Sequence, residues 1–264
     1  MIRLIDKREI YKCHGVIADF VDYQTDDEKA NLIALRFSEP RPSLSGDNGY
    51  SFPKLVCNCY LPKSLCDYLH HINCDFNDHL RQIALQLANI YDVNLEDISL
   101  ISTGVDMNEM EYAEETFGDF WVVAWVTAGF KHNALRVGVD TAHGIEIGGK
   151  FTECGTINII LSTNASLSLA TMASSFITIT EAKGIALQDL MIHSSFNPRL
   201  QATGTGTDQI IVVSGHDFPC RYVGGHTKLG ELIAKAVTRA CKMACSRQLA
   251  KNPHYHTELE PDPL

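Results

Sequence analysis

Runs of apolar residues, and their alternation with polar ones, divide the chain into predicted strands. Alternation over 10–21 and 30–37, around an acidic Asp26-Asp27-Glu28, predicts a β-hairpin. Two almost wholly apolar runs, Trp121–Ala128 and Thr156–Ser162, are typical of strands that are covered on both faces. Further strands are expected at Leu55–Tyr60, at Ile98–Ser102, at Gln209–Val213, and at Ala134–Val139, the last as the hairpin partner of Trp121–Ala128.

Apolar positions at helical spacing predict helices at Asp78–Tyr91, Ser166–Leu190 and about Lys228–Leu249, and a shorter one at Pro62–His71. Thr227 is the expected N-cap of the last long helix. Ser166–Leu190 is apolar nearly all round, so we expect it to be buried. Within it, we expect the charges of Glu181 and Lys183 to reach solvent near the helix end; the alternative is that they are paired or functional.

The remaining segments are expected to be irregular. Pro40–Pro53 is a Pro-, Gly- and Ser-rich loop, and the acidic segment Asn108–Gly118 is solvated surface. The Pro-containing tail from Asn252 should be disordered, so its His254 and His256 are discounted as ligands. The pattern predicts an α/β or layered α+β fold, with a mixed sheet packed against long helices and an elaborated N-terminal half. We expect a single domain over 1–250 and a flexible tail over 251–264.

Composition narrows the choice of partners. A formal net charge of −10 argues against nucleic acid and anionic membranes, which require a basic surface. No apolar run reaches the length of a membrane span, and the charged first ten residues do not resemble a signal peptide. We therefore expect a cytoplasmic protein with a small-molecule partner and no membrane insertion. The sequence leaves homo-oligomerisation open.

Nine cysteines are most simply buried small apolar residues. The spacing of Cys57, Cys59, Cys66 and Cys74 fits no common metal-ligand pattern. We expect the thiols of Cys57 and Cys59 to point to opposite faces of their strand.

Four loops combine glycine, threonine, asparagine and charge next to strand or helix ends, where binding groups collect. The last of them contains the Gly/Thr alternation Thr203–Thr207 followed by Asp208. It lacks the lysine of a phosphate-binding P-loop and precedes a strand, which argues against nucleotide binding. The four loops are Ser102–Asn108, Thr127–Arg136, Gly155–Asn158 with Asn164, and Thr203–Asp208 with Gly225–Glu231.

Three residues near these loops are candidates for catalysis. His226 precedes a helix N-terminus, whose dipole favours the neutral imidazole that a base or a metal ligand needs. Asp208 and Glu181 could complete an acid/base pair or a metal site of two carboxylates and one histidine. Gly155-Thr156 can be a plain strand start, or the cleavage point that exposes a catalytic threonine in some hydrolases.

Several of these segments together resemble the adenosylcobinamide amidohydrolases, enzymes of corrinoid salvage. The similarity covers about residues 10–245, and each piece alone is weak while the combination is specific. Asn48-Gly49 also fits the family, but Tyr50 stands where a second glycine is expected. The cysteine-rich stretch 57–74 has no counterpart in the family. The matching segments are LRFSEPRPSLS (35–45), VTAGFKHNALRVG (126–138), GTINIILSTNASLS (155–168), ITEAKGIALQDL (179–190), ATGTGTDQIIVVSG (202–215) and GGHTKLGELIAKAV (224–237).

The resemblance implies hydrolysis of the amide that joins the cobyric acid portion of the corrinoid to aminopropanol. The corrinoid is then the substrate, and no cofactor is implied. For this reaction our hypothesis gives His226 the acid/base role and lets Asp208 or Glu181 orient it or activate water. Backbone N–H groups of Gly204, Thr205, Gly206 and Thr207 would form the oxyanion site, and Asn133, Asn158 and Asn164 would bind the corrin amides. A metal-dependent amidohydrolase, with a divalent ion on the same residues, and a non-catalytic corrinoid-binding protein remain alternatives.

Overall fold

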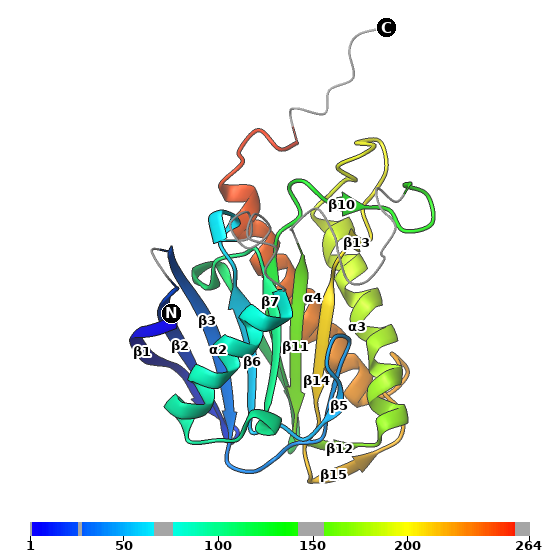
Figure 1. Cartoon of the computed structure of the whole chain (residues 1–264). Helices are drawn as coiled ribbons and strands as arrows, with labels where there is room; N and C mark the ends of the chain where they lie inside the picture. The colour runs from blue at the N-terminus through cyan, green and yellow to red at the C-terminus, as the bar shows by residue number, and fades with distance from the viewer. Residues whose placement is uncertain (1, 26–27, 66–75, 142–155, 257–264) are drawn as a thin grey trace, which may run out of the picture.

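Two β-sheets pack face to face, and helices cover their outer faces (Figure 1). The computed structural model describes residues 2–25, 28–65, 76–141 and 156–256. Helix α2 lies on the first sheet, and α3 and α4 lie on the second, so the layers run helix, sheet, sheet, helices. The predicted class, a mixed sheet packed against long helices with an elaborated N-terminal half, is confirmed.

The first sheet contains the N-terminal half of the chain, in the strand order β1-β2-β3-β6-β7. Its first four strands are antiparallel, while β6 and β7 run parallel and α2 crosses between them. The elements are β1 (Ile2–Cys13), β2 (Val16–Thr25), β3 (Glu28–Phe37), β6 (Leu55–Tyr60), α2 (Phe76–Tyr91) and β7 (Ile98–Thr103).

The second sheet has the order β5-β4-β14-β11-β9-β8. Strands β11 and β14 at its centre are parallel and are joined by α3, so both begin at the same edge of the sheet. Helix α4 follows β14 and returns along the same face (Figure 1). The elements are β4 (Ser43–Ser45), β5 (Gly49–Ser51), β8 (Glu111–Phe117), β9 (Phe120–Ala128), β11 (Ile157–Thr163), α3 (Leu169–Asp189), β14 (Gln209–Val213) and α4 (Lys228–Ala250).

Short elements connect these layers. A two-stranded pair joins β10 (Ala134–Leu135) to β13 (Gly204–Thr205), and another joins β12 (Ala165–Leu167) to β15 (Phe218–Cys220). Two 3-10 turns, η1 (Leu95–Asp97) and η2 (Met107–Glu109), flank β7. Thr227 caps α4 as predicted, because its side chain accepts a hydrogen bond from the N–H of Gly230.

The apolar runs that predicted the central strands form the core between and behind the sheets. Trp125 and Ile160 point into the space between the two sheets, whereas Val126 and Ile159 point to the helices on the other face. Since successive side chains of a strand alternate between faces, only a strand covered on both sides can be apolar throughout. That is why β9 and β11 read as continuous apolar runs.

Several expectations about the elements are wrong. Strand β1 was anticipated only at its last residues, because the predicted strand 10–21 contains the turn between β1 and β2, and Pro40–Pro53 contains the short β4–β5 hairpin. Asn108–Gly118 contains the edge strand β8, whose glutamates pair with basic residues of α4, as in the Glu111–Arg247 ion pair. Ala134–Leu135 pairs with β13 and not with β9. Helix α3 is not buried all round, because Ile177 is 63% exposed.

The cysteines of β6 also differ from expectation. Cys57 and Cys59 lie in the same core cluster beneath α2, because residues two apart on a strand share a face. Burial raises the pKa of both thiols, so they serve as packing groups.

The tail was expected to be disordered from Asn252, but the structure describes residues 252–256. Within them Tyr255 stacks on His193, with ring centroids 4.4 Å apart. The predicted helix at Pro62–His71 begins with a helical turn at 63–65, and the remainder lies outside the described residues, as does the glycine-rich connection 144–149. Within the described residues, the longest helices are too polar to cross a membrane. The division into one domain and a tail stays a prediction.

Candidate functional site

Residues of all four predicted loops meet at the edge where β11 and β14 begin, the first of them through the Ser102 carbonyl oxygen, which accepts a hydrogen bond from Asn158 Nδ2 at 2.8 Å. The N–H of Gly129 donates to the carbonyl oxygen of Thr156 at 3.0 Å, which ties the loop after β9 to the start of β11. The β10–β13 pair then holds Leu135 against Gly204. This edge therefore gathers polar groups of segments that lie up to about 100 residues apart in sequence.

A lysine–aspartate ion pair is at the centre of this edge. Lys183 Nζ donates to Asp208 Oδ2, and the two side chains are only 8% and 13% exposed. Lys183 comes from α3 and Asp208 immediately precedes β14. Removing an ion from water costs several kcal/mol, so a lysine is buried in this way only when its charge is matched by a partner. The expectation that Lys183 reaches solvent is wrong.

Asp208 has its oxygens fully occupied by donors. Its Oδ1 accepts from the N–H of Ile157 at 3.0 Å, and the Thr205 hydroxyl also donates to it. The N–H of Thr205 lies 3.1 Å from Oδ2, beside Lys183. A carboxylate offers about four lone-pair positions, and here four donors occupy them. Asp208 is thus held in a fixed orientation by its hydrogen bonds.

A chain of amide and hydroxyl groups continues from this pair into the interface between the sheets. The Thr156 hydroxyl lies 2.6 Å from the carbonyl oxygen of Thr207 and 3.1 Å from Asn158 Oδ1. Asn158 Nδ2 donates to Asn58 Oδ1 at 2.9 Å, and Asn58 Nδ2 donates to Thr127 Oγ1 at 3.0 Å. Because the members satisfy one another, this network fixes the register of the two sheets next to the ion pair.

Helix α4 closes the other side of the ion pair with Cys241 and Cys245. Burial raises the pKa of the Cys245 thiol to about 12, and the negative charge of Asp208 adds to this rise. Burial likewise raises the pKa of Cys241 well above the ordinary value. Both thiols therefore stay protonated at neutral pH, which excludes them as thiolate nucleophiles.

His226 does not contact the ion pair. It is exposed, in the loop that precedes α4, and its ring centroid lies 6.3 Å from that of Tyr222. This loop is fixed to α3 where Thr178 Oγ1 donates to the carbonyl oxygen of Val223 at 2.9 Å. Lys183 lies five residues further along α3, a rise of roughly 7.5 Å, and it faces the sheet. The structure gives no contact that would let Asp208 orient His226.

Glu181 lies on the outer side of α3. It is exposed, as expected, and it lines a groove of about 700 Å³ between α3 and α4, together with basic residues of α4 such as Lys235, Arg239 and Lys242. Within the described chain it makes no hydrogen bond or ion pair. Glu181, Asp208 and His226 are therefore not assembled into one acid/base or metal site.

The asparagines expected to bind substrate also separate. Asn133 is buried in the loop that joins this edge, whereas Asn164 lies at the far end of β11. There Asn164 Oδ1 accepts from the N–H of Trp121 at 3.1 Å and its Nδ2 donates to the Asp119 carbonyl oxygen. Asn164 lies seven positions after Ile157, a distance of roughly 23 Å along a strand. Asn164 is thus a structural residue of the opposite end.

Lys183 and Asn58 are polar residues of this site that the sequence reasoning did not assign. The signal for Lys183 was present, because Ile179 and Leu187, four residues before and after it, are both fully buried. Asn58 lies in an apolar strand between two buried cysteines and carried no comparable signal.

The described chain offers few metal ligands near the ion pair. Among its residues, the group of three potential ligands with atoms within 4.8 Å of one another is Cys13, His14 and Glu114, which lies elsewhere in the fold. The proposed two-carboxylate, one-histidine metal site at Asp208 is therefore not formed by these residues.

Comparison with known proteins bears on the chemistry of this site. The family model described as adenosylcobinamide amidohydrolase matches residues 17–253. The uncharacterized protein MJ1613 of Methanocaldococcus jannaschii is 43% identical over 232 residues, which cover 84% of this chain and 88% of that protein. The adenosylcobinamide amidohydrolase of Methanosarcina mazei is 30% identical over 162 residues, 56% of this chain and 66% of that protein.

Among solved structures, the PH0078 protein of Pyrococcus horikoshii OT3 overlaps 84% of this chain and 77% of its own, with a TM-score of 0.39 and 10% identity. At that level the overlap carries no conclusion about fold or function.

Proposed function

Since the chain belongs to the adenosylcobinamide amidohydrolase family, we propose that it hydrolyses the amide between the cobyric acid portion of adenosylcobinamide and aminopropanol. Water supplies a hydroxyl group to the acyl carbon and a proton to the departing amine. The products are adenosylcobyric acid and free aminopropanol. Family membership supports the class of reaction, a hydrolysis of a carbon–nitrogen bond, and the named relative supports the substrate.

We place the reaction at the edge that carries Lys183 and Asp208. The observation behind this assignment is a lysine that is 7% exposed and is held by a carboxylate that four donors fix in position. Amide hydrolysis develops negative charge on the carbonyl oxygen, and a preorganised cation stabilises that charge most strongly where water is scarce. In this proposal Lys183 stabilises the oxyanion and Asp208 holds the ammonium in place.

The glycine-rich loop next to the ion pair is the proposed substrate contact. Gly206 and Thr207 are exposed, although the Thr207 carbonyl oxygen accepts from the Thr156 hydroxyl, while the Thr205 side chain is used on Asp208. The corrin periphery carries many amides, which match backbone N–H and carbonyl groups and the amide of Asn133. Asn158 is excluded from this role, because it is fully buried and its amide nitrogen donates to Asn58 Oδ1 and to the Ser102 carbonyl oxygen.

The test is incubation of purified protein with adenosylcobinamide, with mass spectrometry of the corrinoid and assay of aminopropanol. We expect wild-type protein to release both products, and Lys183→Met and Asp208→Asn to lose at least about 100-fold in kcat/KM. His226→Ala and Glu181→Gln are the matched controls, and both should stay within a few-fold of wild type. Circular dichroism confirms that each variant is folded.

Two outcomes would contradict the proposal. Corrinoid that is bound but recovered unchanged would make the chain a binding protein. Loss of turnover in His226→Ala with full activity in Lys183→Met would move the chemistry to the start of α4.

A further inference from the structure

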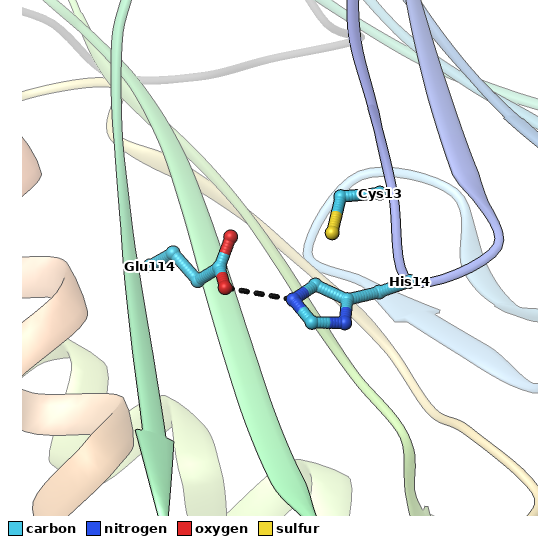
Figure 2. A group of neighbouring side chains, drawn as sticks. All are labelled: Cys13, His14 and Glu114. Atoms are coloured by element: carbon cyan, nitrogen blue, oxygen red, sulfur yellow. Dashed lines mark hydrogen bonds and ion pairs between the residues drawn. The ribbon is translucent and has the colours of Figure 1, made fainter.

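A cysteine, a histidine and a glutamate converge at the opposite end of the fold from Asp208. Cys13 and His14 belong to the β1–β2 connection of the first sheet, and Glu114 belongs to the edge strand β8 of the second. His14 Nε2 lies 2.7 Å from Glu114 Oε1, and one potential ligand atom from each residue lies within 4.8 Å of the other two. Figure 2 shows the Cys13 thiol close to the hydrogen bond between the His14 imidazole and the Glu114 carboxylate.

The imidazole of His14 is held in place from two sides. It stacks on Trp121 with ring centroids 4.8 Å apart and an interplanar angle of 15°. The second oxygen of Glu114 accepts a hydrogen bond from the Tyr11 hydroxyl at 3.1 Å. Metal-binding carboxylates and histidines commonly have partners of this kind, which fix the orientation of the ligand atom.

The backbone at His14 does not require a histidine. Cys13 pairs with Val16, so His14 and Gly15 form a two-residue hairpin turn, and their φ angles are 55° and 71°. A turn with two positive φ values is best made by Asn-Gly or Asp-Gly. An imidazole at this position therefore adds a side-chain function that the turn itself does not need.

We propose that Cys13, His14 and Glu114 bind a single Zn²⁺ ion that joins the two sheets. Thiolate, imidazole and carboxylate are all zinc ligands, at about 2.0–2.3 Å, and three of them leave the fourth tetrahedral position to water. Tetrahedral geometry places ligand atoms roughly 3.5 Å apart. The histidine–glutamate contact opens slightly and the exposed Cys13 side chain swings inward when the ion binds. The thiol loses its proton in the process.

The ion would be structural with respect to the proposed hydrolysis. Trp121 and Thr127 are six residues apart on β9, roughly 20 Å, and Thr127 belongs to the network beside the ion pair while Trp121 stacks on His14. A zinc ion at His14 clips the β1–β2 hairpin to β8, so it should raise stability without taking part in amide cleavage.

The experiment uses tag-free, chelator-treated, full-length protein. Zn²⁺ is titrated by calorimetry, Tm is measured with and without one equivalent of Zn²⁺, and Co²⁺ is added as a spectroscopic probe of thiolate ligation. We expect a site of about one ion per chain, a higher Tm with zinc, and a thiolate-to-cobalt charge-transfer band. Cys13→Ser, His14→Asn and Glu114→Gln should each weaken binding at least about 10-fold. His14→Asn keeps a residue that suits the turn.

Cys220→Ser is the matched control, since Cys220 is a free, partly exposed thiol outside the cluster. It should retain the ion, the Tm increase and the cobalt band. Binding that survives all three cluster substitutions, or that is lost equally in Cys220→Ser, would overturn the proposal. Corrinoid hydrolysis is assayed in parallel and should be the same with and without zinc, so the two proposals can fail separately.

Discussion

Asp208 and Lys183 form their ion pair directly against the Cα of Gly204. A methyl group at this position would lie 2.4 Å from Asp208 Oδ2 and 2.7 Å from Lys183 Nζ, distances that real side chains do not reach. The charged atoms thus occupy the space that any other residue would fill with its Cβ. The glycine in this loop is required by close approach to the ion pair.

Gly204→Ala should therefore push the ammonium and the carboxylate apart and lower kcat/KM for the corrinoid by at least about 10-fold, because misplaced charges stabilise the oxyanion less well. Gly184→Ala is the control one residue beyond Lys183. Among the described residues, and apart from its neighbours and its own helix backbone, no atom lies within 4 Å of the added methyl group. Alanine in a helix is favoured over glycine by about 0.5–1 kcal/mol. Equal activity of both variants would contradict this argument.

Removal of one partner of the ion pair should also destabilise the fold. Lys183→Met leaves the Asp208 carboxylate buried without its cation, and Asp208→Asn does the reverse, at a cost of about 3–5 kcal/mol each. The double variant should lose less than the sum of the two, because neither charge is then left alone. Urea unfolding of all four proteins measures the coupling. Strictly additive losses would show that the two groups do not interact in solution.

Asn164 should affect stability and leave turnover unchanged. Its side chain accepts from the N–H of Trp121 at the end of the fold away from Asp208. Asn164→Ala leaves that buried N–H without a partner, which costs roughly 1–3 kcal/mol in the free energy of unfolding. Asn108→Ala, at an exposed position, should stay within about 0.5 kcal/mol of wild type. A change in kcat/KM of folded Asn164→Ala would return this residue to the substrate site.

Tyr255 should make stability fall at high pH. Burial raises its pKa to about 12, against about 10 in an unfolded chain. Between these values the unfolded chain loses the tyrosine proton and the folded chain keeps it, so this contribution is complete below pH 10 and is lost as pH rises toward 12.

The stability gap between wild type and Tyr255→Phe should therefore shrink from pH 8 to pH 11 in urea unfolding. Tyr222 is 60% exposed, and Tyr222→Phe is the matched variant at an exposed tyrosine. Parallel pH profiles of wild type and Tyr255→Phe would show that residue 255 does not pack as described.

The central strands and long helices could be predicted because each carries its burial pattern within a few residues. Strand β9 and helix α4 are examples, the one apolar throughout and the other apolar on one stripe. Strand β1 could not, because it is an edge strand whose charged side chains face water. The partner of Ala134–Leu135 was missed because it lies some 70 residues away, at Gly204–Thr205.

The candidate site was predicted only in part, because it too depends on contacts between residues far apart in sequence. Loops with the right chemistry could be found one at a time, and residues from all four of them do meet. Which residues face one another depends on the direction of α3. Glu181 and Lys183 are two residues apart, so they lie about 200° apart around the helix axis. One faces the outer groove and the other faces Asp208. Ile179 and Leu187, four residues to either side of Lys183, indicated that Lys183 points inward, but Glu181 shares a face with Ile177, which is equally apolar and is exposed in the structure, so the pattern was ambiguous.

Thr156 provides a test of how the amide is attacked. Its hydroxyl lies beside the Thr207 carbonyl oxygen and Asn158 Oδ1. Thr156 directly precedes Ile157, the first residue of β11, whose N–H donates to Asp208 Oδ1. Thr156→Val keeps the volume and removes the hydroxyl, and it should lower kcat at least about 10-fold, whereas Thr156→Ser should keep most of the activity.

Intact-mass measurement of the active protein separates the two interpretations of this threonine. A strand-start residue gives a single mass for the whole chain, which we expect. A fragment that begins at Thr156 would instead show cleavage after Gly155, and the new amino group would then be the natural base for the hydroxyl. Full activity of Thr156→Val, with the chain intact, would remove Thr156 from the chemistry and leave water as the attacking group.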